Sequence, residues 1–278
     1  MQTQPKRILI LCKTYPSPSS KYSETSCVAG MCEDGRLIRI YPVPFRLLKD
    51  EQQFKKWQWI TAKFEKSRDD HRPESHRIYV DTVSLESEPM PPGKQGWPKR
   101  MEAIKKLPTF SSFNEMERTR QVNGLTLAIL KPSRIAKLII KSTKHTDWTQ
   151  DELRKLTSWQ KQGQLFSEDE AAIDVALLEK LPYDFYYQCE FNAPEGIDVR
   201  DIKIVDWEIG ALYRRLRKEF GPSGWEAPFR KKYEQELPSK NIMLMMGTIH
   251  RFPDQWLGIS IFAPPKPQSE AADQGLLF

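Results

Sequence analysis

Residues 26–48 read SCVAGMCEDGRLIRIYPVPFRLL, and this stretch predicts a β-hairpin around which the rest of the chain is organised. Two apolar runs, at residues 27–31 and 37–41, flank the dipeptide formed by Asp34 and Gly35. Asp-Gly accepts the positive φ angles that a tight hairpin turn requires. The two runs are therefore expected to pair as antiparallel strands.

The second strand of this hairpin shows a clear alternation. Ile38 and Ile40 are expected to face the core, and Arg39 between them is expected to point the other way. The Pro-x-Pro at residues 42–44 is expected to end the ladder, because proline has no N–H to donate. Phe45 is then expected to fold back over the end of the sheet.

Three more strands are predicted in the first third of the chain, at residues 7–13, 56–66 and 76–86. Residues 14–22, TYPSPSSKY, are expected to form a loop, because the prolines oppose both helix formation and strand pairing. Five strands with short polar links and no helix between them are typical of an antiparallel sheet or a partly closed barrel. We expect this β-rich subdomain to span residues 1–88.

The remainder predicts helices mixed with strands, so the predicted fold class is α+β. Prolines and glycines at residues 89–98 mark a boundary, and a second subdomain over 99–262 is expected to pack on the first. Its predicted helices are 98–107, 114–121, 149–161, 204–220 and 229–237, and its predicted strands are 124–131, 135–141, 183–191, 241–249 and 255–262. Residues 263–278 are expected to form a flexible tail.

Composition narrows the class of protein. The chain has 278 residues, of which 39% are hydrophobic, which is enough to build a core and excludes disorder of the whole. A net charge of +6 favours nucleic acid or another polyanion as partner without requiring it. No apolar run approaches the roughly 20 residues that span a bilayer. Four cysteines without a CxxC pair, and the lack of a signal-peptide pattern, indicate the reducing cytoplasm.

The chain ends in DQGLLF, which places the large apolar side chains of the tail at its extreme end. Gln274, Leu277 and Phe278 resemble the pentapeptide by which bacterial replication, repair and mobile-element proteins bind the β sliding clamp. In that family the glutamine amide is hydrogen-bonded and the Leu-Phe pair fills a hydrophobic cleft. The family often has leucine second and a small polar or acidic residue third, where this chain has Gly275 and Leu276.

The resemblance implies a DNA-associated protein of the bacterial cytoplasm, recruited to replication or repair sites through its C-terminal peptide. Its implied partners are the sliding clamp and DNA. Cations on the outer face of the 204–220 helix and its continuation, and cations mixed with tyrosines in the first loop, are the candidate nucleic-acid contacts. These residues are Lys13, Tyr15, Lys21, Arg214, Arg217, Lys218, Arg230 and Lys231. Glutamates interrupt the helical face, so an ordinary solvated surface is the alternative interpretation.

An enzyme is the alternative hypothesis, and it depends on two pairs of carboxylates. Asp70 and Glu74 lie in one turn, and Asp206 and Glu208 lie near a helix start; either pair could hold Mg²⁺ for phosphodiester cleavage. Residues two apart on a helix point about 200° from each other, which favours the first pair. Apart from Mg²⁺ in this alternative, no cofactor is expected, because Walker A and GxGxxG patterns are absent from the sequence. The spacing of the cysteines is typical of buried small side chains and not of a zinc site.

Overall fold

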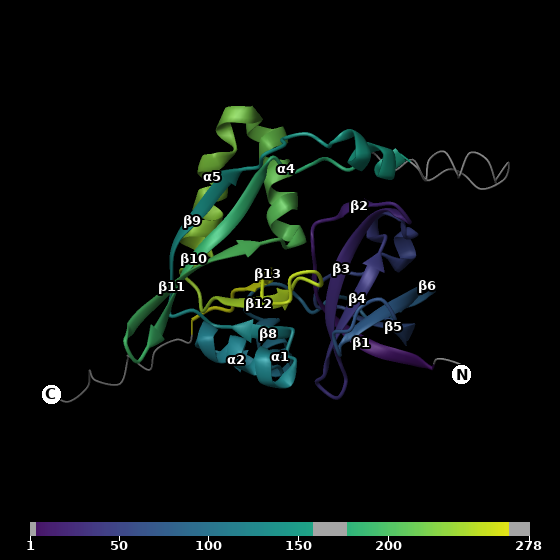
Figure 1. Cartoon of the computed structure of the whole chain (residues 1–278), viewed down its shortest axis with the longest axis horizontal. Helices are drawn as coiled ribbons and strands as arrows, with labels where there is room; N and C mark the ends of the chain where they lie inside the picture. The colour runs from purple at the N-terminus through teal and green to yellow at the C-terminus, as the bar shows by residue number, and fades with distance from the viewer. Residues whose placement is uncertain (1–3, 158–176, 267–278) are drawn as a thin grey trace.

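The computed structural model describes residues 4–157 and 177–266, which form two β-sheets lying side by side (Figure 1). The first sheet contains β1 (Pro5–Lys13), β2 (Ser17–Ser19), β3 (Ser23–Cys32), β4 (Leu37–Val43), β5 (Trp59–Lys66) and β6 (Ser75–Leu85). Its order is β1-β5-β6-β4-β3-β2, and β3 also pairs with β1. Five strands thus form an irregular ring of pairings. The shortest pairing is the parallel one between β4 and β6, which contains only Arg39 with Ser75 and Ile40 with His76. The α+β class and the partly closed first sheet are confirmed.

The predicted hairpin is β3 with β4. Gly35 in its turn has a φ of 84°, as the Asp-Gly pattern requires, and the Asp34 carboxylate accepts a hydrogen bond from the backbone N–H of Arg36 at 3.0 Å. Ile38 and Ile40 belong to the core inside the ring, together with Phe45, which begins a short 3-10 helix (Phe45–Leu47). A second 3-10 turn follows at Asp50–Gln52.

One prediction about prolines is wrong and another is confirmed. Residues 14–22 are not all loop, because β2 pairs along the edge of β3 with Pro18 opposite Glu24. An edge strand tolerates proline, since one side of its backbone needs no ladder partner. The Pro-x-Pro at residues 42–44 does end the ladder, because β4 stops at Val43, which pairs with Ser26 across a bulge.

The second sheet has the order β7-β8-β12-β13-β11-β10-β9. Its strands are β7 (Thr109–Phe110), β8 (Leu127–Leu130), β9 (Arg134–Ser142), β10 (Tyr183–Ala193), β11 (Gly196–Ile204), β12 (Met243–Thr248) and β13 (Trp256–Phe262). The helices are α1 (Trp97–Ile104), α2 (Phe113–Asn123), α4 (Trp207–Gly224) and α5 (Glu226–Arg230), followed by a π-helical stretch (Lys231–Glu236). Residues 150–157 are helical, and the rest of the helix predicted at 149–161 lies outside the described residues.

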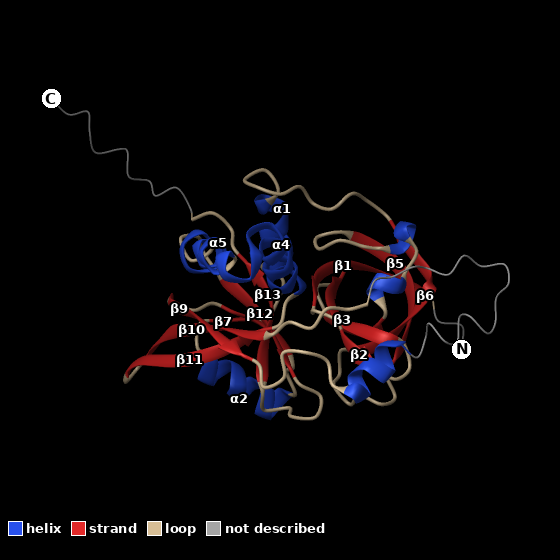
Figure 2. Ribbon diagram, turned by 90° about the horizontal axis from the view of Figure 1, so that it is seen from above, coloured by secondary structure: helices blue, strands red, loops and turns tan. Residues whose placement is uncertain are grey.

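Strand alternation in the second sheet sends side chains to two different cores. Leu244 and Met246 of β12 pack with Phe229 and other residues of α4 and α5, which cover one face of the sheet (Figures 1 and 2). Met243 and Met245 point to the opposite face, which packs on the first sheet and on α1. We name this contact the shared layer; its members include Leu9, Leu11, Ala29, Met31, Ala103, Ile104, Leu127, Ile129, Met243, Met245, Ile259 and Phe262.

The region around α4 differs in part from the prediction. The helix begins at Trp207 and not at residue 204, because β11 occupies residues 196–204, and this strand was not predicted. β11 carries many charges, and its Ile197 and Val199 are exposed, so it lacks the alternation of a half-buried strand. Gly221 leaves the helical conformation with a φ of 76°, which glycine adopts readily, and one further turn follows. Within residues 4–157 and 177–266, no helix has the length and apolar character needed to cross a membrane.

Candidate functional site

A pocket of about 800 Å³ lies between the two sheets, and we name it the interface pocket. On the side of the first sheet it is bounded by the segment 14–22, by β4 and by the turn before β6; on the other side it is bounded by residues 247–251 and β13. Five cationic side chains, two carboxylates and three tyrosines line it: Lys21, Arg39, Arg72, Arg77, Arg251, Asp69, Asp70, Tyr15, Tyr22 and Tyr41. The lining therefore carries an excess of positive charge.

Arg39 forms the buried part of the pocket wall and is 3% exposed. Its Nε donates to Glu74 Oε1 at 3.2 Å, and its Nη2 donates to the carbonyl oxygen of Thr126 at 2.9 Å. The bond to Thr126 ties a strand of the first sheet to the chain just before β8, and the two bonds together hold the guanidinium plane in place. The prediction that Arg39 points away from the core of the hairpin is correct, but the face it points to is buried against the second sheet.

Asp70 and Arg72 form a second link between the sheets. The Arg72 guanidinium donates to both carboxylate oxygens of Asp70, at 2.6 to 3.1 Å, and to the carbonyl oxygen of Thr248 at 2.5 Å. Ser75 Oγ donates to the same carboxylate at 2.7 Å. Burial alone would raise the pKa of Asp70, but the hydrogen bonds from Arg72 and Ser75 outweigh it and hold that pKa well below its usual range. Asp70 therefore acts as an anchor for Arg72.

The outer rim of the interface pocket holds two cationic side chains that no carboxylate among the described residues neutralises. Among the described residues no carboxylate pairs with Lys21 or Arg251, and both side chains are exposed. The Lys21 ammonium lies 5.2 Å from the ring centroid of Tyr22. Arg77, by contrast, is paired with Asp69. Lys21 and Arg251 are thus the rim charges available to an anionic ligand.

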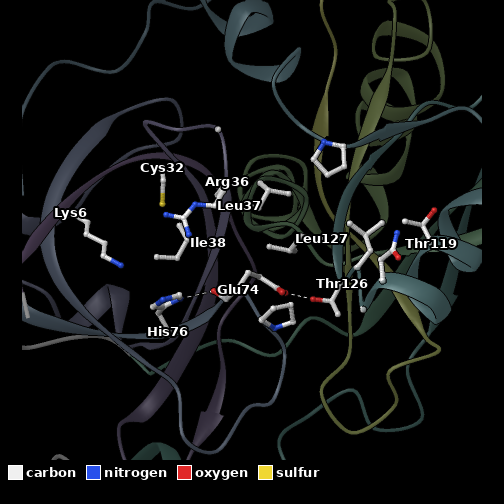
Figure 3. A pocket seen from close by; sticks show the side chains of 16 residues that line it. Lys6, Cys32, Arg36, Leu37, Ile38, Glu74, His76, Thr119, Thr126 and Leu127 are labelled. Atoms are coloured by element: carbon white, nitrogen blue, oxygen red, sulfur yellow. Dashed lines mark hydrogen bonds between the residues drawn. The ribbon is translucent and has the colours of Figure 1, made fainter.

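Glu74 does not join Asp70 in one metal site, because it lines a different pocket of about 590 Å³ (Figure 3). Its carboxylate accepts hydrogen bonds from Arg39 and from Thr126 Oγ1. His76 lies at the backbone of Glu74, with Nδ1 donating to the carbonyl oxygen of that residue at 2.8 Å. Within residues 4–157 and 177–266, no three His, Cys, Asp or Glu side chains gather around a possible metal position.

The second carboxylate pair lies in a small pocket of about 170 Å³ at the start of α4. Asp206 caps the helix, with Oδ1 accepting the N–H of Ile209 at 2.9 Å, while Glu208 pairs with Lys56 at 2.6 Å. Lys13 lines this same pocket and not the interface pocket. Its ammonium lies 3.3 Å from the centroid of the Phe45 ring, and burial lowers the pKa of Lys13 to about 7. Lys13 therefore lies apart from Tyr15 and Lys21, with which the sequence grouped it.

The predicted basic face of α4 and α5 is neutralised only in part. Arg214 pairs with Glu179 at 2.9 Å, and Arg230 lies between the carboxylates of Glu226 and Glu234. Arg217 donates to the neutral hydroxyl of Tyr213, and Lys218 and Lys231 have no carboxylate partner among the described residues. The solvated-surface interpretation thus fits the paired arginines and leaves the other three cations open. Gln274, Leu277 and Phe278 lie outside the described residues.

Comparison with known proteins places the chain in a family. Residues 108–277, which are more than half of the chain, match the family described as a domain of unknown function, DUF8757. The chain belongs to the DUF8757 family. Residues 4–106 match a second domain of unknown function, DUF8758, and no curated protein matches the chain.

Solved structures add little to this assignment. One similar structure is described as "Structure of murine DNA binding protein bound with ds DNA"; it is 6% identical, has a TM-score of 0.31, and the match covers 96% of this chain and 100% of that one. A likeness this low carries no argument about the DUF8757 chain.

The interface pocket draws on both matched segments. Arg39 and Arg72 belong to the DUF8758 segment, and Arg251 and residue Gly247 of the floor belong to the DUF8757 segment. Of the residues singled out in the sequence, Tyr15, Lys21 and Asp70 line this pocket. Arg39 was noticed only as an outward-facing residue of the hairpin. One signal in the sequence could have identified Arg39 as a site residue. It is a lone arginine between two core isoleucines, in a strand on which a second sheet packs.

Asp206, in the DUF8757 segment, is expected to make the free energy of unfolding depend on pH. Burial, followed by the nearby Glu208 carboxylate, raises the pKa of Asp206 to about 6. A folded-state pKa above the unfolded value means that the protonated group favours folding; this contribution is present below about pH 4 and is lost as the pH rises through 6. Asp206→Asn still caps the helix but cannot ionise. We expect it to raise the free energy of unfolding at pH 7.5 by about 1–3 kcal/mol.

Urea unfolding at a series of pH values measures this effect. The intact chain is expected to lose stability between pH 4 and pH 7 relative to Asp206→Asn, so that the difference between them grows as the pH rises. Asp81→Asn, at an exposed position, is the control and should follow the intact chain. A constant difference between Asp206→Asn and the intact chain over this range would contradict the assignment.

Proposed function

We propose that the protein binds nucleic acid and that the interface pocket receives one unpaired nucleotide. The observation that carries this proposal is the lining of the pocket, which combines unpaired rim cations with tyrosine rings and a buried guanidinium. A volume of about 800 Å³ lies in the range of small-ligand sites. Cations neutralise phosphates, and aromatic rings stack on bases that have left a duplex or belong to a single strand.

The parts of the pocket suggest how a nucleotide would lie in it. Lys21 and Arg251 stand at the rim, where a phosphate can keep contact with water and with the rest of the strand. Tyr22 and Tyr41 also line the pocket and offer aromatic rings on which a base can stack. The floor is formed by Arg39 and by apolar residues such as Leu257 and Ile259. A charged outer part and a mostly apolar inner part match the two ends of a nucleotide.

Charge reversal at the rim tests this proposal. Lys21→Glu with Arg251→Glu is expected to weaken binding of a labelled single-stranded oligonucleotide at least about tenfold, because two phosphate contacts become repulsive. The slope of log affinity against log salt should fall by about 1.4, the value for two contacts on a single strand. Fluorescence anisotropy between 50 and 300 mM salt measures both quantities.

The matched control carries the same change of charge on the other surface. Lys218→Glu with Lys231→Glu reverses two cations of the α4 and α5 face that have no carboxylate partner among the described residues, and it should leave affinity nearly unchanged. If this control variant loses binding and the rim variant does not, the helical face and not the pocket is the nucleic-acid contact. If the intact chain binds no oligonucleotide even at 50 mM salt, the proposal fails.

Recruitment through the tail is the second part of the proposal. Its support is the resemblance of Gln274, Leu277 and Phe278 to the clamp-binding peptide. A weak peptide contact becomes effective when the body of the protein holds DNA, because the second contact is then intramolecular, at roughly millimolar effective concentration. The proposed protein is thus a DNA-associated factor of replication or repair that carries its own nucleotide pocket.

A metal-dependent nuclease remains a separate hypothesis, and no described contact favours it. Asp70 is bonded to Arg72 and Ser75, Glu74 is bonded to Arg39, and Asp206 caps a helix. Incubation with labelled DNA and RNA in Mg²⁺ or Mn²⁺ tests the nuclease hypothesis directly. Cleavage that disappears in Asp70→Asn while the protein stays folded would revive it.

A further inference from the structure

The loop between β12 and β13 carries an exposed aromatic ring at the edge of the interface pocket. Phe252 is 53% exposed, and among the described residues its ring stacks on no other aromatic side chain and on no cation. The two residues before it, His250 and Arg251, line the pocket, whereas Phe252 does not. Adjacent Cα atoms are about 3.8 Å apart. Phe252 therefore lies just outside the rim of the pocket, beside Arg251.

The backbone of this loop is held in place before any ligand arrives. The N–H of Phe252 donates to the carbonyl oxygen of Ile249 at 3.2 Å, and the carbonyl oxygen of Phe252 accepts the N–H of Gln255 at 2.9 Å. Pro253 follows directly, and a residue before proline is restricted to extended conformations. The ring of Phe252 is thus carried on a fixed backbone while its side chain stays in solvent.

The start of the loop is also tied to the first sheet. The Arg72 guanidinium donates to the carbonyl oxygen of Thr248 at 2.5 Å, and His250 Nε2 lies 3.9 Å from Asp70 Oδ1. Both contacts join the loop to the turn before β6, which forms the opposite wall of the interface pocket. The pocket and the exposed ring beside it therefore keep a fixed position relative to each other.

We propose that Phe252 is a wedge that enters the base stack of duplex DNA, in the place left by the nucleotide that the interface pocket receives. This inference rests on the proposed function and names double-stranded DNA as the ligand. An extruded nucleotide stays joined to both neighbours in its strand, so the gap that it leaves in the duplex must lie at the mouth of the pocket. Apolar side chains, phenylalanine among them, insert between base steps in this way.

A wedge is useful because extrusion of a base costs free energy. The extruded base loses its pairing and stacking, and the bases on both sides of the gap lose a stacking partner. The Phe252 ring offers those bases a new stacking surface, while Lys21 and Arg251 at the rim can contact phosphates next to the extruded nucleotide. A single strand has no gap to fill, so the ring is expected to stabilise duplex complexes and to matter little for a single strand.

The test compares affinities of the full-length chain for three labelled oligonucleotides by anisotropy at 50 mM salt. They are a single strand, the matched duplex that contains this strand, and the same duplex with one central mismatch. We expect the mismatched duplex to bind about tenfold more tightly than the matched one, because a mismatched base is extruded at lower cost. Phe252→Ala should weaken binding of both duplexes about tenfold, the effect of losing one base–aromatic stack, and should leave single-strand affinity nearly unchanged.

Phe220→Ala is the matched control. Phe220, in α4, is 49% exposed and does not line the interface pocket, so this variant should keep all three affinities. Phe252→Trp retains a ring that can stack and should keep most of the duplex affinity. Melting temperatures confirm that each variant is folded, and little change is expected because both positions are exposed.

The outcomes separate this inference from the function on which it rests. Binding of the single strand without binding of either duplex would overturn the inference and leave nucleic-acid binding standing. Equal affinities for the matched and mismatched duplexes, or unchanged duplex affinity in folded Phe252→Ala, would also overturn it. An equal loss of single-strand and duplex affinity in this variant would make the ring an ordinary stacking contact and not a wedge. No binding of any of the three would overturn both the inference and the proposed function.

Discussion

Glu74→Ala is expected to lower the free energy of unfolding by about 3–5 kcal/mol, which is the usual loss when one partner of a buried ion pair is removed. The side chains of Arg39 and Glu74 are 3% and 10% exposed, so the Arg39 charge would stay largely buried after its carboxylate partner is removed. Thr126 Oγ1 loses an acceptor in the same step. Urea unfolding followed by tryptophan fluorescence measures the change.

Two further variants define what the pair contributes. Glu236→Ala breaks an exposed ion pair with Lys232 and should leave the midpoint almost unchanged. Arg39→Met with Glu74→Met removes both charges together, and it should recover much of the stability lost in Glu74→Ala, since no buried charge is left unpaired. If Glu74→Ala unfolds at the same urea concentration as the intact chain, the link between the sheets does not depend on this pair.

Leu277→Ala with Phe278→Ala is expected to abolish binding to the β sliding clamp. Truncating two anchors that fill a hydrophobic cleft costs roughly 2 kcal/mol or more each where they are hot spots. Gln274→Ala removes one amide and should cost about 1 kcal/mol. Removal of residues 274–278 should have the same effect as the double substitution. Isothermal titration calorimetry with purified clamp measures all of these changes.

Gln268→Ala changes a glutamine of the same tail outside the predicted motif, and it is the control for this series. It should bind like the intact chain. The folding midpoint of each variant confirms that the body of the protein is unaffected. Absence of clamp binding by the intact chain at tens of micromolar would refute the recruitment proposal and leave the interface pocket as the argument for nucleic acid.

The local parts of the fold could be predicted from the sequence, because their signals are local. Asp34 and Gly35 fixed the hairpin turn, the spacing of apolar residues predicted α4, and alternation placed Ile38 and Ile40 in the core. β11 could not be found this way, since it is a charged strand held by its neighbours β10 and β13. Pro18 was misjudged because the effect of a proline depends on whether its strand lies at an edge of the sheet, and this is a property of the sheet and not of the local sequence.

The candidate site was predictable only in part, because it exists only where two distant segments meet. Tyr15 and Lys21 could be recognised as a cationic and aromatic loop. Asp70 was noticed for its charge, but its role as an anchor depends on Arg72 reaching Thr248, 176 positions further along the chain. The buried position of Arg39 likewise depends on the carbonyl oxygen of Thr126, 87 positions further along the chain, and nothing in either local sequence indicates that the two meet.

The shared layer has a consequence for how this gene can change. The boundary between the two matched segments, near residue 107, looks like a natural point for recombination. However, Leu9 and Met31 on one side pack in a single core with Ile129 and Met245 on the other. A second segment transplanted from a distant relative would have to bring side chains of complementary size. Substitutions across the layer are therefore expected to be tolerated best as compensating pairs that keep the total side-chain volume.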